Sequence, residues 1–328
     1  MTSSHTRLAE LLAPVASGME RMRELLTDQL RDESAAVSDM TDHIGRFRGK
    51  QLRAAVCLLV GEATGNVTEE HPTVAAIIEM IHLATLVHDD VLDGAEVRRR
   101  VACVNQRWDN QVAVLLGDFL YARAFQLSTE LSSRLCSRVL SRTTQRICAG
   151  EIDQAGMRYD FNLSQERYET VAGAKTATLY AAACELGASY PDREQQGGGE
   201  MSHFGWEIGL AFQIIDDCLD VVGREEEVGK SVGNDVEDGK VTLPVLWVYA
   251  RADEEVRGRI RDAYTAAGLT DRRAALLEVC DFQPGVEFAM GRADELVASA
   301  LARLSTLSST AARRSLEMLG EFVLERKW

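Results

Sequence analysis

Apolar residues recur every three or four positions along most of the chain. Near the start, for example, the apolar positions are Leu8, Leu11, Leu12, Val15, Met19, Met22 and Leu25. This spacing is typical of an amphipathic helix that buries one face. It predicts helices over residues 8–30, 50–62, 70–93, 107–131, 133–158, 165–188, 198–222, 241–252, 254–267 and 285–326, and no strand.

The segments between these helices are too short and too varied in composition to be domain linkers, and no fixed-period repeat occurs. The chain has only five prolines in 328 residues, which also favours long helices. We therefore expect an all-α protein with a single domain over residues 1–328. It should be a bundle of roughly ten or more helices.

Two predicted helices are apolar on almost every side and then end in carboxylates. The run VAAIIEMIHLATLV precedes Asp89 and Asp90, and the run IGLAFQII precedes Asp216 and Asp217. Helices that are apolar all round belong in the interior of a protein. Their acidic ends predict a deep central cavity with an acidic mouth and an apolar interior.

Both carboxylate groups follow the pattern DDxxD. The run HDDVLD contains Asp89, Asp90 and Asp93, and the run IDDCLD contains Asp216, Asp217 and Asp220. Residues four apart share a helix face, so two carboxylates of each run can converge on one or two hard cations, for which magnesium is the natural candidate. A solvated acidic helix end explains one such run equally well, but two runs favour metal ions that stabilise a diphosphate leaving group.

Charge and basic residues narrow the choice of partner. A formal charge of −15 argues against nucleic acid, which needs a basic surface. A diphosphate should nevertheless meet cations, and basic residues lie beside the aspartates or in GKQLR: Lys50, Arg53, Arg98, Arg99, Lys230 and Lys240. Any one of them is compatible with a solvated loop, and it is their grouping that favours phosphate binding.

Four further polar residues lie in apolar helical stretches, namely His82, Lys175, Thr176 and Gln213. Each is explained by packing or by surface exposure when taken alone, and each could also face the predicted cavity. No Walker loop, Ser-His-Asp arrangement or dinucleotide fingerprint is present. NTP hydrolysis, acyl transfer and hydride transfer therefore have no visible motif, and we expect the ionisation of a prenyl diphosphate instead.

The seven cysteines show no CxxC spacing, so buried free thiols are expected rather than zinc ligands or disulfides. The N-terminal sequence lacks the features of a signal peptide, and no stretch is long and apolar enough for a membrane span. These features predict a cytoplasmic protein.

The ordered motifs resemble those of the trans-type polyprenyl diphosphate synthases over roughly residues 20–326. They are GKQLR, IHLATLVHDDVLDGAEVRR, LLGDFLYARAF, GEIDQ, KTATLYAAACELGA, AFQIIDDCLD and GKSVGNDVEDGKVTLP. The resemblance implies the isoprenoid synthase fold, a homodimer, and condensation of isopentenyl diphosphate with an allylic prenyl diphosphate. In that reaction the allylic substrate ionises, the double bond of isopentenyl diphosphate attacks the carbocation, and a proton is lost.

The resemblance also implies roles for particular residues. Asp89, Asp93, Asp216 and Asp220 would bind about three magnesium ions, which manganese can replace, with Asp90 and Asp217 in support. The isopentenyl diphosphate would be held by Lys50, Arg53, His82 and Arg99. The allylic diphosphate would be held by Arg98, Lys175, Thr176, Gln213, Lys230 and Lys240, of which Lys175 and Lys230 would also take part in catalysis. Three positions depart from the family pattern, Ala54, Arg100 and Cys103, and they bear on turnover rather than on reaction type.

The length of the product depends on the helix that leads into Asp89, along which the growing hydrocarbon should lie. The positions one, two and three turns earlier are Ala84 and Thr85, Met80 and Ile81, and Ile77. Ala84 and Thr85 are small, which predicts a product of C20 or longer.

Two other functions stay open on the sequence. A class I terpene cyclase also ionises prenyl diphosphates, but Lys50, Arg53 and Arg99 argue for a second diphosphate site. A non-catalytic subunit of a prenyltransferase would be expected to have lost aspartates or lysines, and both acidic runs are complete.

Overall fold

The computed structural model describes residues 4–47, 49–98, 101–192, 197–223 and 232–325. Within these ranges the regular structure is helical apart from one two-stranded antiparallel sheet, which confirms the all-α prediction. None of the described helices combines the length and the apolar character needed to cross a lipid bilayer.

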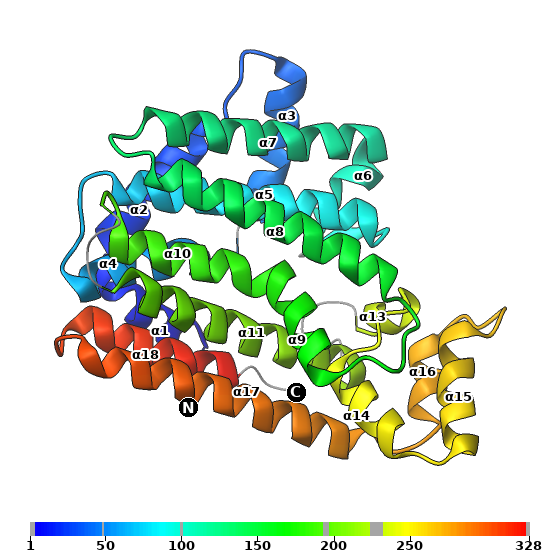
Figure 1. Ribbon diagram of the computed structural model, residues 1–328. Helices are drawn as coiled ribbons and strands as arrows, with labels where there is room; N and C mark the ends of the chain where they lie inside the picture. Colours follow the sequence, from blue (N-terminus) through cyan, green and yellow to red (C-terminus); the bar gives the residue numbers. More distant parts are fainter. Residues whose placement is uncertain (1–3, 48, 99–100, 193–196, 224–231, 326–328) are drawn as a thin grey trace. The chain divides into compact units, whose positions relative to one another are not determined.

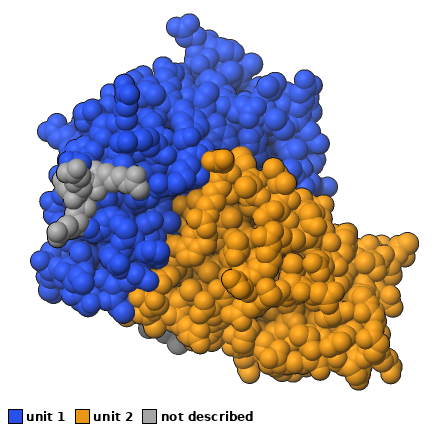
Figure 2. Space-filling view, in the orientation of Figure 1, with its two compact units in different colours: residues 1–144, 179–205, 301–319 blue, residues 145–178, 206–300, 320–328 orange. Residues whose placement is uncertain are grey.

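The chain folds into two compact units, which Figure 2 shows in blue and orange. Unit 1 comprises residues 1–144, 179–205 and 301–319, and unit 2 comprises residues 145–178, 206–300 and 320–328. Several long helices contribute residues to both units. The expected single domain over 1–328 stays a prediction.

The first half of the chain supplies most of unit 1. Its helices, labelled in Figure 1, are α1 Ser4–Leu12, α2 Ala16–Gln29, α3 Ala35–Ile44, α4 Leu52–Thr64, α5 His71–Leu92, α6 Val104–Arg107 and α7 Asn110–Glu130. Helix α5 packs against α2, α4 and α7. Pro72 suits its first turn, where no intrahelical N–H bond is required, and residues 74–81 are all buried. This buried helix leads directly to the first acidic run.

The second half continues with α8 Leu135–Gly156, α9 Gln165–Ala172, α10 Thr178–Ser189, α11 Gly198–Val222, α13 Asn234–Glu237, α14 Leu243–Arg251, α15 Glu254–Thr265, α16 Arg272–Leu277, α17 Gln283–Arg303 and α18 Ala311–Leu324. A π-helical turn, Gly173–Ala177, joins α9 to α10. A Cβ atom at Gly173 would lie 2.3 Å from the Trp206 ring, so only glycine allows α11 to approach this turn so closely. The π turn carries Lys175 and Thr176.

Several predicted boundaries were wrong. The expectation of no strand fails because Val97–Arg98 pairs with Val101–Ala102. These strands have two residues each, too few to produce an alternating pattern. Helix α3 was missed because it has only 10 residues, half of them polar. The predicted helix 285–326 is interrupted after α17 by the 3-10 turn Leu304–Thr306.

The cysteines are free thiols, as expected. Five are buried: Cys57, Cys103, Cys136, Cys184 and Cys218. The prediction of burial was wrong for Cys148, which is exposed, and only partly right for Cys280.

Candidate active site

The first acidic run forms the C-terminal end of α5, within unit 1. The backbone N–H of Asp93 donates to the carbonyl oxygen of Asp89 over 2.8 Å, so the two residues are one helical turn apart and share a face. Both side chains are half-buried. Asp89 and Asp93 are therefore neighbouring carboxylates at the end of this helix.

Asp90 has a different environment from these two. Its side chain is fully buried, and its Oδ1 accepts from Nε and Nη2 of Arg98, each over 2.7 Å. Burial lowers the pKa of Arg98, but the hydrogen bond and the charge of Asp90 outweigh it, and the net shift is upward. Arg98 lies in the small hairpin, so this ion pair fastens the hairpin to the end of α5.

A cluster of basic and aromatic side chains lies elsewhere in unit 1. Arg53 of α4 contacts the Nε2 atom of His82 over 3.1 Å, and its guanidinium lies 4.5 Å from the centre of the Tyr180 ring. His82 is half-buried and Lys50 is exposed. Arg53 and His82, two of the four residues expected to hold isopentenyl diphosphate, are therefore in contact.

The second acidic run forms the C-terminal end of α11, within unit 2. Asp217 is buried and accepts two hydrogen bonds, from the Tyr168 hydroxyl over 2.5 Å and from Gln213 Nε2 over 2.6 Å. The pKa of Asp217 is raised to about 6, chiefly by burial and further by the charges of Asp216 and Asp220; the two hydrogen bonds act in the opposite direction.

The end of α11 is tied to the residues that follow it. Asp220 Oδ2 accepts from the backbone N–H of Asp235 over 2.9 Å, and its carbonyl oxygen accepts from the N–H of Gly233 over 3.0 Å. Arg273 donates to the carbonyl oxygens of Asp220, Val221 and Gly223. These bonds satisfy carbonyls that a helix end leaves without partners.

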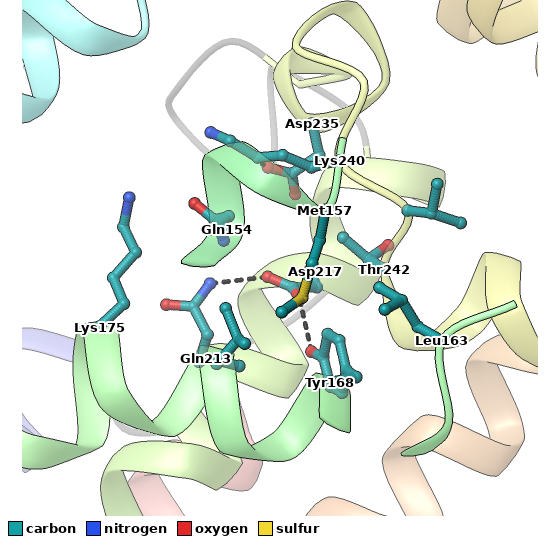
Figure 3. Close-up of a pocket in the computed structure, with 13 residues that line it drawn as sticks. Gln154, Met157, Leu163, Tyr168, Lys175, Gln213, Asp217, Asp235, Lys240 and Thr242 are labelled. Atoms are coloured by element: carbon teal, nitrogen blue, oxygen red, sulfur yellow. Dashed lines mark hydrogen bonds and ion pairs between the residues drawn. The ribbon is translucent and has the colours of Figure 1, made fainter. Parts of the chain in front are cut away.

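A cavity of about 80 Å³ lies beside Asp217 within unit 2. Figure 3 shows its lining, which includes Gln154, Tyr168, Lys175, Gln213, Asp217, Asp235, Lys240 and Thr242. The Lys175 ammonium pairs with Glu151 over 2.8 Å, and that of Lys240 pairs with Asp238 over 2.9 Å. Three residues expected to bind the allylic diphosphate therefore line one cavity.

Thr176 joins the same network without lining the cavity. Its hydroxyl donates to Gln213 Oε1 over 2.7 Å, and Gln213 in turn donates to Asp217. Arg99, Arg100 and Lys230 lie outside the described residues.

Sequence reasoning missed several residues of this site, above all Tyr168, Glu151 and Arg273. Tyr168 is one aromatic residue among several, and it lies 49 positions from its partner Asp217. Glu151 stands in the motif GEIDQ, which supports the family resemblance but assigned it no role. The regular i, i+4 spacing between Gln213 and Asp217 did give a usable signal.

The residues present suit a hard divalent cation. Each acidic run offers carboxylate oxygens, and one of them, the buried Asp90 Oδ2, accepts no hydrogen bond from the described part of the chain. Within the same described ranges, no three His, Cys, Asp or Glu side chains are already grouped as a metal site. Magnesium is compatible with this because it commonly uses one or two carboxylates and completes its shell with water and substrate phosphates.

An all-α fold with two aspartate-rich helix ends defines the class of enzymes that act on prenyl diphosphates. A family model described as Polyprenyl synthetase matches residues 34–278. The chain belongs to this family and is a prenyltransferase.

Its relatives are similar over almost their whole length. The chain is 33% identical to an all-trans-nonaprenyl-diphosphate synthase (geranyl-diphosphate specific) of Rhodobacter capsulatus over 97% of both chains. It is also 33% identical to the octaprenyl diphosphate synthase of Escherichia coli, over 95% of this chain and 96% of the other. A solved polyprenyl synthase from Caulobacter crescentus, complexed with calcium and isoprenyl diphosphate, is 31% identical, with a TM-score of 0.88 and 97% of each chain covered.

Proposed function

We propose that this prenyltransferase condenses isopentenyl diphosphate with geranyl, farnesyl or geranylgeranyl diphosphate to give an all-trans product of C20 or longer. The supporting observation is a feature common to both acidic runs. In each, the second aspartate is buried and held by protein donors, Asp90 by Arg98 and Asp217 by Tyr168 and Gln213. The first and last aspartates of each run are the proposed ligands, and among them Asp220 also accepts a hydrogen bond from the Asp235 N–H.

The proposed ligands are Asp89, Asp93, Asp216 and Asp220, with about three magnesium ions, which manganese can replace. When bound, magnesium supplies positive charge that stabilises the departing diphosphate. Asp90 and Asp217 support the ligands by fixing the two helix ends. A relative complexed with calcium and isoprenyl diphosphate supports a role for divalent cations.

The proposed diphosphate contacts are those expected from the sequence. Lys50, Arg53, His82 and Arg99 would bind isopentenyl diphosphate, and Arg98, Lys175, Thr176, Gln213, Lys230 and Lys240 would bind the allylic diphosphate. Lys175 pairs with Glu151 and Arg98 with Asp90 in the structure. These carboxylates orient the two cationic side chains at the proposed diphosphate site.

The proposed product length rests on α5. The side chains of Ile77, Met80, Ile81 and Ala84 are fully buried, and the hydroxyl of Thr85 donates to the carbonyl oxygen of His82 over 2.8 Å. No aromatic side chain occupies these positions. Relatives named as nonaprenyl, octaprenyl and heptaprenyl diphosphate synthases support a long product.

We also propose a cytoplasmic homodimer. Helix α7 exposes the apolar residues Val114 and Leu115, and covering them with a second copy would remove that surface from water. One relative is named heptaprenyl diphosphate synthase component 2, which makes a second, different subunit the competing arrangement.

The test is incorporation of labelled isopentenyl diphosphate into farnesyl diphosphate by the purified chain, with magnesium. Asp216→Asn removes one ligand charge and should lower the rate by at least about a hundredfold. Asp294→Asn is the matched control, because Asp294 is exposed on α17, and it should keep the wild-type rate. No incorporation by the wild-type chain alone would contradict the proposal.

A further inference from the structure

Tyr168 lies at the second acidic run although no sequence motif marks it. It belongs to α9, its side chain is buried, and its hydroxyl oxygen is 2.5 Å from Oδ2 of the equally buried Asp217. Figure 3 shows this contact at the wall of the cavity. A hydrogen bond to a buried carboxylate is charge-assisted and strong.

The directions of the hydrogen bonds are fixed by chemistry. A carboxylate only accepts, so Tyr168 donates, and burial together with the Asp217 charge raises the pKa of Tyr168, which keeps its proton on the oxygen. On the other side, Thr176 donates to Gln213 and Gln213 donates to Asp217 Oδ1. Each oxygen of Asp217 thus has its own protein donor.

Without Tyr168 this arrangement would lose one of its two restraints. Asp217 adjoins Asp216 and lies one turn from Asp220, and the charges of both disfavour its ionised form. A carboxylate released on one side can rotate about its side-chain torsions toward a cation bound by its neighbours. The relative positions of the two proposed ligands would then be less well defined.

We infer that Tyr168 is a positioning residue for magnesium: its hydroxyl holds the Asp217 carboxylate, so that Asp216 and Asp220 keep the geometry needed to bind the ion. Tyr168 touches neither the reacting atoms nor the metal in this account. The inference rests on the proposed function, since it concerns the same magnesium ligands.

The experiment is Tyr168→Phe, which removes one oxygen atom and keeps the ring. We expect the magnesium concentration for half-maximal activity to rise about tenfold, the factor that 1.4 kcal/mol represents. At saturating magnesium, the KM values for both substrates should stay within about twofold and kcat should be largely restored. Calorimetric titration of magnesium with inorganic diphosphate should show the same weakening without any turnover.

The matched control is Tyr249→Phe. Tyr249 is also a buried tyrosine of unit 2, and its hydroxyl is bonded to Arg261 over 2.5 Å, outside the acidic run. The Tyr249→Phe variant should have the same magnesium dependence of activity as the wild type. A purely structural role for Tyr168 would lower thermal stability in both variants alike and would leave magnesium binding by the folded fraction unaltered, which would overturn the inference.

Asp217→Asn probes the same contact from the other side if Tyr168→Phe fails to fold. It should weaken magnesium binding, and in the double variant the two effects should not add, because both remove one interaction. Additive effects, or wild-type magnesium binding in Asp217→Asn, would overturn the inference. Inactivity of the wild-type chain would instead contradict the proposed function, so the two failures are distinguishable.

Discussion

At the scale of single residues, the second aspartate of each acidic run is buried, and so is Asp220, the last aspartate of the second run. A buried carboxylate needs donors, and Asp90 and Asp217 obtain them from different parts of the chain, Asp90 from the hairpin and Asp217 from α9 and its own helix. The two copies of the motif therefore hold their second aspartate in different ways.

The raised pKa of Asp217 predicts a pH dependence of stability. Its carboxyl titrates at about 6 in the folded protein, against a reference value of 3.8, so the folded state binds this proton more tightly than the unfolded chain. In metal-free protein, the free energy of unfolding should fall by up to about 3 kcal/mol as the pH rises from roughly 4 to 6. Urea unfolding at a series of pH values, with a chelator present, measures this fall in the free energy of unfolding.

Asp217→Asn isolates this contribution, because asparagine does not titrate and all other groups are common to both proteins. Between roughly pH 4 and 6, the free energy of unfolding of the variant should fall less than that of the wild type, because the contribution of Asp217 is absent. Identical pH profiles for the variant and the wild type would show that Asp217 does not titrate in this range.

Arg273 provides a second prediction at this scale. Its side chain donates to three carbonyl oxygens at the C-terminal end of α11, where a positive charge is favourable. Arg273→Met should lower the free energy of unfolding by about 2 kcal/mol. Arg259→Met is the control, because Arg259 is exposed and makes one bond of 3.3 Å to the Glu278 carbonyl, and its loss should cost under about 0.5 kcal/mol.

At the scale of elements, sequence reasoning succeeded where the signal is local. The apolar runs of α5 and α11, their acidic ends, and the Gln213–Asp217 pair all follow from helical spacing. The hairpin was missed because its strands have two residues each, and α3 because it is short, with 10 residues of which half are polar. Tyr168 and Arg273 were missed because their partners are 49 and more residues away, and no local pattern encodes a tertiary contact.

Helix α5 carries the prediction on product length. Ala84 is one turn before the first acidic run and is fully buried. Ala84→Phe should shorten the product by at least one five-carbon unit, because the larger side chain fills the path of the hydrocarbon, at a cost of about 1–3 kcal/mol in stability. Mass spectrometry of the products measures their length independently of the amount of active enzyme.

Ala298→Phe makes the same substitution at an exposed position of α17 and should leave the product distribution unchanged. Met80→Ala, one turn deeper, should lengthen the product. An unaltered distribution in both α5 variants would show that the hydrocarbon does not follow this helix.

At the scale of the whole molecule, the chain is strongly acidic, with a formal charge of −15, and yet belongs to a family whose substrates are anions. Local cations must therefore reverse the field where substrate binds. Lys175, Lys240 and Arg98 lie beside the acidic runs, but each is paired with a carboxylate, Glu151, Asp238 and Asp90 respectively. Magnesium would therefore supply most of the net positive charge. The charge balance thus ties substrate binding to the metal.

The most direct test of this account is the size and structure of the product. The purified chain is incubated with magnesium, labelled isopentenyl diphosphate and farnesyl diphosphate, and the products are separated and identified by mass spectrometry. We predict linear all-trans diphosphates of C20 or longer. Unchanged farnesyl diphosphate would favour a subunit that needs a catalytic partner, a cyclic hydrocarbon would indicate a terpene cyclase, and either result would contradict the account.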